Sequence, residues 1–68
     1  MNLQELIELR KELKVELLEL AAYSGLLEQY LEQIESGKVM PLESDLKRIE
    51  QALRLIAESP GRINDVDS

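Results

Sequence analysis

The apolar residues of this chain recur every three or four positions through most of its length, which is the period of an amphipathic α-helix. The clearest run, in the second half of the chain, places Leu46, Ile49 and Leu53 on one side of a helix. The whole pattern predicts an all-α protein with four main helices, at residues 3–13, 16–23, 27–35 and from about 44 to 58.

Short polar residues and glycines mark the ends of these helices. Asn2, followed three residues later by Glu5, is a variant of the capping box that opens a helix. Ser24-Gly25 is expected to end the second helix, because glycine readily adopts the left-handed conformation of a C-cap. Ser36-Gly37 ends the third helix in the same way. The second and third helices are therefore joined by a tight turn.

One small apolar core is expected. A chain of 68 residues buries only about 60% of its unfolded surface, so every helix has to contribute to the core. The sequence has two aromatic residues, both Tyr, so this core is built mainly from aliphatic side chains. The apolar side of the third helix is marked by Leu27, Tyr30, Leu31 and Ile34. The expected core residues are Leu9, Leu13, Leu20, Ala21, Leu31, Ile34, Ile49 and Leu53.

A single domain is expected at residues 1–59, because Ser59-Pro60-Gly61 stops the fourth helix. The last residues, 60–68, contain only Ile63 and Val66 as apolar groups. We therefore expect them to form a flexible C-terminal tail.

The charge and the missing residue types argue against several functions. Fourteen acids against eight bases give a net charge of −6, the wrong sign for a surface that collects phosphates. The chain has no His, no Cys, no Gly-rich phosphate loop and no metal-ligand spacing, so we expect no enzyme, metal site, cofactor or small-molecule substrate. A signal-peptide pattern and a long apolar run are also missing, which predicts a cytoplasmic protein without a membrane span.

Several residue groups occur in an order and spacing that a known family shares. Leu20-Ala21 in the second helix is followed by the turn Ser24-Gly25-Leu26. The other matching residues are Leu9-Arg10, Leu13, Tyr30-Leu31, Ile34-Glu35, Gly37-Lys38, Pro41, Leu46, Arg48-Ile49 and Ala52-Leu53. In these residues, from about Leu6 to Leu55, the chain resembles the Cro/C1-type (XRE) helix-turn-helix family of phage repressors and small bacterial regulators.

This resemblance implies a lambda-repressor-like fold, which is a small bundle of four to five helices, and a role as a DNA-binding transcriptional regulator. It also implies a buried ion pair between Arg10 and Glu35, which ties the first helix to the third. Gln29 and Gln33 fall where family members face the base edges of double-stranded DNA, and Lys38 falls where a phosphate contact is expected.

The chain departs from the family at positions that bind DNA. Glu16 and Leu17 replace a polar pair that anchors a phosphate, and Leu27-Glu28 replaces a Ser or Thr followed by a basic or amide residue. The stretch from Lys14 to Lys38 contains five acids and two bases. Glu28 is able to accept a hydrogen bond from cytosine, so base readout stays open, but the expected DNA-reading surface is acidic and weak.

Three leucines raise an alternative function. Leu17, Leu18 and Leu27 stand where family members generally expose polar groups. Either a partner covers them as an apolar patch, or a different packing of the fourth helix buries them, and the sequence leaves both interpretations open. The first interpretation predicts a protein–protein interaction module that no longer binds DNA, with a second copy or another protein as its partner.

Overall fold

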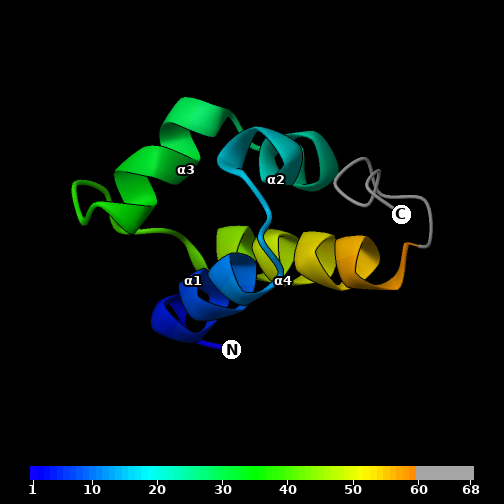
Figure 1. The fold of residues 1–68 in the computed structure, drawn as a ribbon. Coiled ribbons are helices and arrows are strands. Elements are labelled where there is room, and N and C mark those ends of the chain that lie inside the picture. The colour runs from blue at the N-terminus through cyan, green and yellow to red at the C-terminus, as the bar shows by residue number, and fades with distance from the viewer. Residues whose placement is uncertain (60–68) are drawn as a thin grey trace.

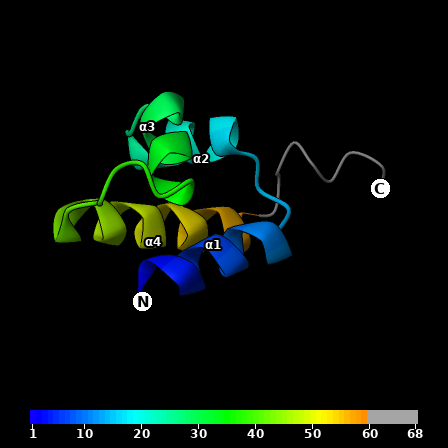
Figure 2. The ribbon, with the colours of Figure 1, turned by 90° about the vertical axis from the view of Figure 1, so that its left-hand side faces the viewer.

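The computed structural model describes residues 1–59, which contain no strand and form four helices: α1 (Leu3–Glu12), α2 (Leu17–Ser24), α3 (Glu28–Glu35) and α4 (Glu43–Glu58). The predicted all-α class is confirmed. Figures 1 and 2 show α1 and α4 side by side, with α2 and α3 packed over them. The long helix α4 contacts both α1 and α2, so it organises the bundle. The predicted tail at residues 60–68 lies outside the described residues.

Local signals in the sequence set the helix ends. The backbone N–H of Glu5 donates to Asn2 Oδ1 at 2.8 Å, and the backbone N–H of Asn2 donates to Glu5 Oε1 at 3.0 Å, which completes the capping box. Helix α2 ends at Gly25, whose φ of 77° lies in the left-handed region. The predicted helix boundaries agree with the structure to within about one residue.

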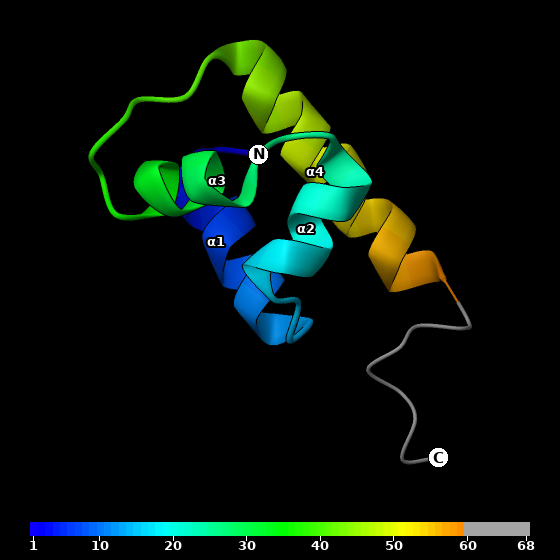
Figure 3. The ribbon, with the colours of Figure 1, turned by 90° about the horizontal axis from the view of Figure 1, so that it is seen from above.

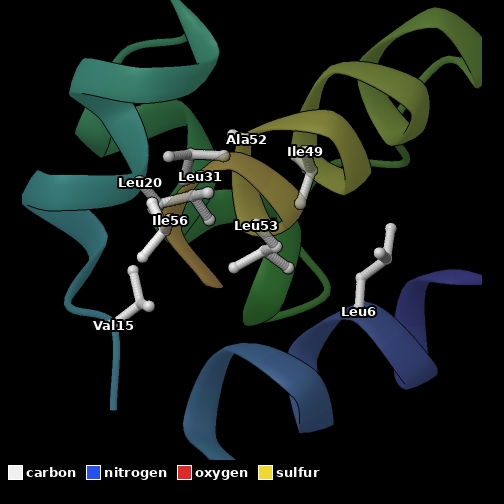
Figure 4. Close-up of a cluster of buried hydrophobic side chains, with 8 residues drawn as sticks. All are labelled: Leu6, Val15, Leu20, Leu31, Ile49, Ala52, Leu53 and Ile56. Carbon is white, nitrogen blue, oxygen red and sulfur yellow. The ribbon is translucent and has the colours of Figure 1, made fainter. Parts of the chain in front are cut away.

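A single apolar core joins all four helices. Its side chains come from every helix and from the connection between α1 and α2 (Figure 4). The core cluster consists of Leu6, Val15, Leu20, Leu31, Ile49, Ala52, Leu53 and Ile56. Ile34 on α3 is also buried.

The predicted core is partly correct. Of the predicted residues, Leu20, Leu31, Ile34, Ile49 and Leu53 are buried. The prediction was wrong in degree for three others, since Leu9, Leu13 and Ala21 pack against the core but stay partly exposed. It omitted Leu6, Val15, Ala52 and Ile56. The spacing identified the correct face of each helix, but it did not tell which turns of that face a neighbouring helix covers.

The prediction for Leu27 was wrong, because this residue does not lie on the apolar side of α3. It is the N-cap, with extended backbone angles (φ −69°, ψ 142°), and 76% of its surface is exposed. The helix begins one residue later than predicted, so the helical spacing that linked Leu27 to Leu31 and Ile34 does not apply to it.

Candidate nucleic-acid interface

A surface hollow at α3 and the turn that follows it gathers three of the four residues predicted to contact DNA. Leu31 and Ile34 anchor the inner face of the helix in the protein interior. Gln29 and Gln33, four residues apart, therefore share the outer face. They line the hollow together with Glu32, Ser36 and Lys38. Glu28, the fourth predicted residue, is exposed in the first turn of α3 and does not line this hollow.

The turn after α3 brings Lys38 back toward the end of the helix. Gly37 has a φ of 84°, and the next residue, Lys38, donates its backbone N–H to the carbonyl oxygen of Gln33 at 2.9 Å. The Ser36 hydroxyl donates to the same carbonyl at 3.1 Å. This turn places a cationic side chain beside the two glutamines, which is an arrangement suited to one phosphate next to the base edges.

An ion pair holds α3 to α1. Arg10 Nε and Nη2 donate to Glu35 Oε2 and Oε1, both at 2.7 Å, in a bidentate arrangement. Arg10 Nη1 also donates to the carbonyl oxygen of Val15 at 2.7 Å. The side chains of Arg10 and Glu35 are 14% and 18% exposed, so the pair is partly buried and not fully buried as the resemblance implied.

A second polar contact, which the sequence did not suggest, holds α3 to α4. Tyr30 Oη donates to Asp45 Oδ2 at 2.5 Å, and the same oxygen accepts the backbone N–H of Leu42 at 3.1 Å. The hydrogen bond to Asp45 raises the pKa of Tyr30 above its ordinary value, because ionisation of the phenol would remove the donated proton. Asp45 lies in the first turn of α4, and no local signal in the sequence pairs it with a tyrosine fifteen positions earlier.

The outer surface of α3 is acidic. Glu28 and Glu32 are both exposed, and Lys38 lines the hollow together with Glu32. Glu35 contributes little to this exposed negative charge, because it is paired with Arg10. An exposed face with two carboxylates and one ammonium group repels a phosphate backbone more than it attracts one.

The three leucines of the predicted interface have different surroundings. Leu17 packs against the core and is partly buried, so the interpretation that packing covers the leucines fits this residue. Leu18 and Leu27 are 66% and 76% exposed, and the fourth helix does not bury them.

Within residues 1–59, no group of three or more His, Cys, Asp or Glu side chains is arranged to hold a metal ion. None of the helices in this range combines the length and apolar character needed to cross a membrane.

A model of a known protein family matches most of this chain. The sequence model of a family described as helix-turn-helix matches residues 6–56. This range includes all of α2 and α3 and most of α1 and α4. Neither the curated proteins nor the solved structures gave a match.

Proposed function

Since this chain belongs to the Cro/C1-type helix-turn-helix family, we propose that it is a small transcriptional regulator that binds double-stranded DNA through α3. The family is one of DNA-binding regulators, and the match spans both helices of the motif. In this proposal α3 recognises the edges of the bases while making few contacts with the phosphates.

The hollow on α3 is the observation that carries this proposal. It gathers Gln29 and Gln33 from the exposed side of α3, whose other side is fixed in the protein interior, and Lys38 from the turn that follows. A glutamine amide donates to and accepts from adenine in the major groove, and a lysine contacts phosphate. Under this proposal Glu28, one turn before Glu32 at the start of the helix, accepts a hydrogen bond from the amino group of cytosine.

The acidic surface limits the affinity of one copy for DNA. Phosphate contacts supply most of the nonspecific binding free energy, and each one adds about 0.9 to the slope of log affinity against log salt. With Lys38 as the cation beside the glutamines, the slope should be shallow. Useful affinity then requires a second DNA-binding unit, such as a second copy on an adjacent half-site.

A titration of duplex DNA tests the proposal. Fluorescence anisotropy with random duplexes of about 20 base pairs, long enough for two half-sites, is measured at two salt concentrations. The double variant Glu28→Lys/Glu32→Lys should bind more tightly and with a steeper salt slope. The matched control is Glu8→Lys/Glu12→Lys, which reverses two exposed acids at the same spacing on α1.

Two results would contradict the proposal. If the α1 control gains as much affinity as the α3 variant, net charge and not the surface of α3 governs binding. If Gln29→Ala/Gln33→Ala selects the same sequences from a random duplex library as the unaltered chain, α3 does not read the bases.

The exposed leucines support a second candidate function, a protein-interaction module without DNA binding. Leu18 and Leu27 bury little of their apolar surface in the folded chain, so folding alone does not explain them. This function predicts that the chain self-associates, or binds another protein, and binds no duplex at either salt concentration. Sedimentation of the unaltered chain beside Leu27→Ser measures the self-association.

A further inference from the structure

Three strongly exposed apolar side chains lie at the start of α3 and in the loop that leads from α3 into α4. Leu27 is the N-cap of α3, and Met40 and Leu42 belong to the loop between α3 and α4. Their exposed fractions are 76%, 89% and 67%, the largest among the big apolar residues of the described chain. We call these three residues and their surroundings the α3–α4 edge.

The starts of α3 and α4 are tied to each other along this edge. Tyr30, three residues after Leu27, donates its hydroxyl to Asp45, which is three residues after Leu42. The same Asp45 oxygen accepts a hydrogen bond from the backbone N–H of Leu42, so the backbone of Leu42 lies close to the tyrosine hydroxyl. Figure 3 shows the loop that contains Met40 passing around the outside of this part of the molecule.

Leucine is a poor choice at both N-cap positions if folding alone is considered. Ser, Thr, Asp and Asn are preferred there, because their side chains accept a hydrogen bond from the first turn of the helix. Neither Leu27 nor Leu42 makes such a side-chain bond, and neither is buried. Residues that break a local rule without a compensating gain in the folded chain tend to mark functional surfaces.

The charges next to these leucines restrict the kind of partner. In each helix the N-cap leucine is followed by an exposed glutamate, Glu28 in α3 and Glu43 in α4. A phosphate backbone or an anionic lipid surface would meet carboxylates here. A second copy that presents the same edge would bring like charges together. A protein surface that combines cations with apolar groups is complementary to both features.

From these observations we propose that the α3–α4 edge binds a cationic amphipathic helix of a partner protein. The apolar side of that helix covers Leu27, Met40 and Leu42, and its Lys or Arg residues pair with Glu28 and Glu43. This interaction does not rest on DNA binding by α3, and it competes with the cytosine contact proposed for Glu28, because both would use the same carboxylate. Binding of such a helix explains why leucines occupy two N-cap positions that stay exposed in the folded chain.

The probe is a synthetic peptide of about 18 residues, long enough for five helical turns, made of lysines with leucines at helical spacing. Isothermal titration calorimetry measures its affinity for the whole chain, and amide chemical shifts map the contact. Two control peptides are used: one has glutamates in place of the lysines, and the other has the same composition in scrambled order. The mapped shifts should centre on residues 27–30 and 40–45, and both control peptides should bind at least about tenfold more weakly.

The decisive variant is Leu27→Ser/Leu42→Ser, because serine is a favourable N-cap. Its melting temperature should equal or exceed that of the unaltered chain, so any loss of binding is not a loss of fold. Its affinity for the peptide should fall by about tenfold or more. Leu18→Ser, which changes a leucine of similar exposure on α2, should bind the peptide as the unaltered chain does.

Three results would overturn the proposal. The first is that the lysine peptide does not bind, or binds no better than its scrambled control. The second is that Leu18→Ser weakens binding as much as the double variant does. The third is that duplex DNA, and not the peptide, shifts the amides of residues 40–45.

Discussion

Replacing Arg10 with Met removes three hydrogen bonds that join α1 to α3 and to the connection before α2. Two of them go to Glu35 and one goes to the carbonyl oxygen of Val15, all at 2.7 Å. The substitution keeps a long apolar side chain, so the packing of the Arg10 methylenes is largely preserved. What changes is that Glu35, only 18% exposed, loses its partner.

The expected loss follows from this partial burial. Breaking a fully buried ion pair by removing one partner costs about 3 to 5 kcal/mol. Water still reaches both side chains of this pair, so we expect Arg10→Met to lower the free energy of unfolding by about 2 to 3 kcal/mol. The double variant Arg10→Met/Glu35→Met removes the stranded charge and should recover most of this loss. About 1 kcal/mol should remain lost, because the carbonyl of Val15 still lacks its donor.

Urea denaturation followed by far-UV circular dichroism measures these free energies. The unaltered chain, both single variants and the double variant form a double-mutant cycle. Arg54→Met is the control, because Arg54 pairs with Glu50 on the surface and is 68% exposed. That substitution should change stability little, since exposed ion pairs contribute little. A double variant no more stable than Arg10→Met would refute the argument that the unpaired carboxylate is what destabilises the single variant.

Three further substitutions probe the core, the helix turn and the contact between α3 and α4. Leu20→Ala removes a fully buried side chain, so it should cost about 2 to 5 kcal/mol and leave the chain largely unfolded by circular dichroism; a nearly unchanged melting curve would contradict the assigned core. Gly25→Ala should cost about 1 kcal/mol or more in urea denaturation, because φ is 77° and the new Cβ would lie 3.3 Å from Arg48 Nη1. Tyr30 donates to Asp45, and this hydrogen bond raises the pKa of the phenol, so the folded state holds the proton more tightly than the unfolded state. The resulting stabilisation is complete below the unfolded pKa of about 10 and is lost as pH rises through the raised folded value, so melting temperatures should fall less with alkaline pH in Tyr30→Phe than in the unaltered chain.

The helix ends were predictable because their causes are local. Asn2 and Glu5 are three residues apart and satisfy each other within one helical turn. Gly25 adopts a conformation that few other residues tolerate. Neither feature depends on how the helices pack, so a short stretch of sequence contains all the necessary information.

The depth of burial was less predictable, because it depends on the neighbouring helices. Leu6 and Leu9 occur at helical spacing on α1, yet Leu6 is buried and Leu9 is only partly covered. Val15 lies in the connection between α1 and α2, where no helical period applies, and it is nevertheless 1% exposed. Which end of an apolar stripe is covered follows from the crossing of the helices, and a spacing of three or four residues does not contain that information.

The candidate site shows the same limit. The resemblance to the family assigned the glutamines at positions 29 and 33 to one DNA-facing side, and the structure has them in one hollow. The contact of Tyr30 with Asp45 joins two helices across a loop. A tyrosine and an aspartate in two helices are common in any sequence, so only the three-dimensional arrangement reveals this hydrogen bond.

These contacts determine how changes on the outside of α3 can be interpreted. Helix α3 is held on three sides: its Leu31 and Ile34 pack in the interior, its Glu35 pairs with α1, and its Tyr30 donates a hydrogen bond to α4. None of these anchoring residues lines the hollow of the proposed DNA-reading surface. Substitutions in that hollow should therefore change binding while the position of α3 stays fixed. The same separation means that one interior is compatible with very different exteriors, so the acids and leucines around α3 say nothing against the fold and decide only what the helix contacts.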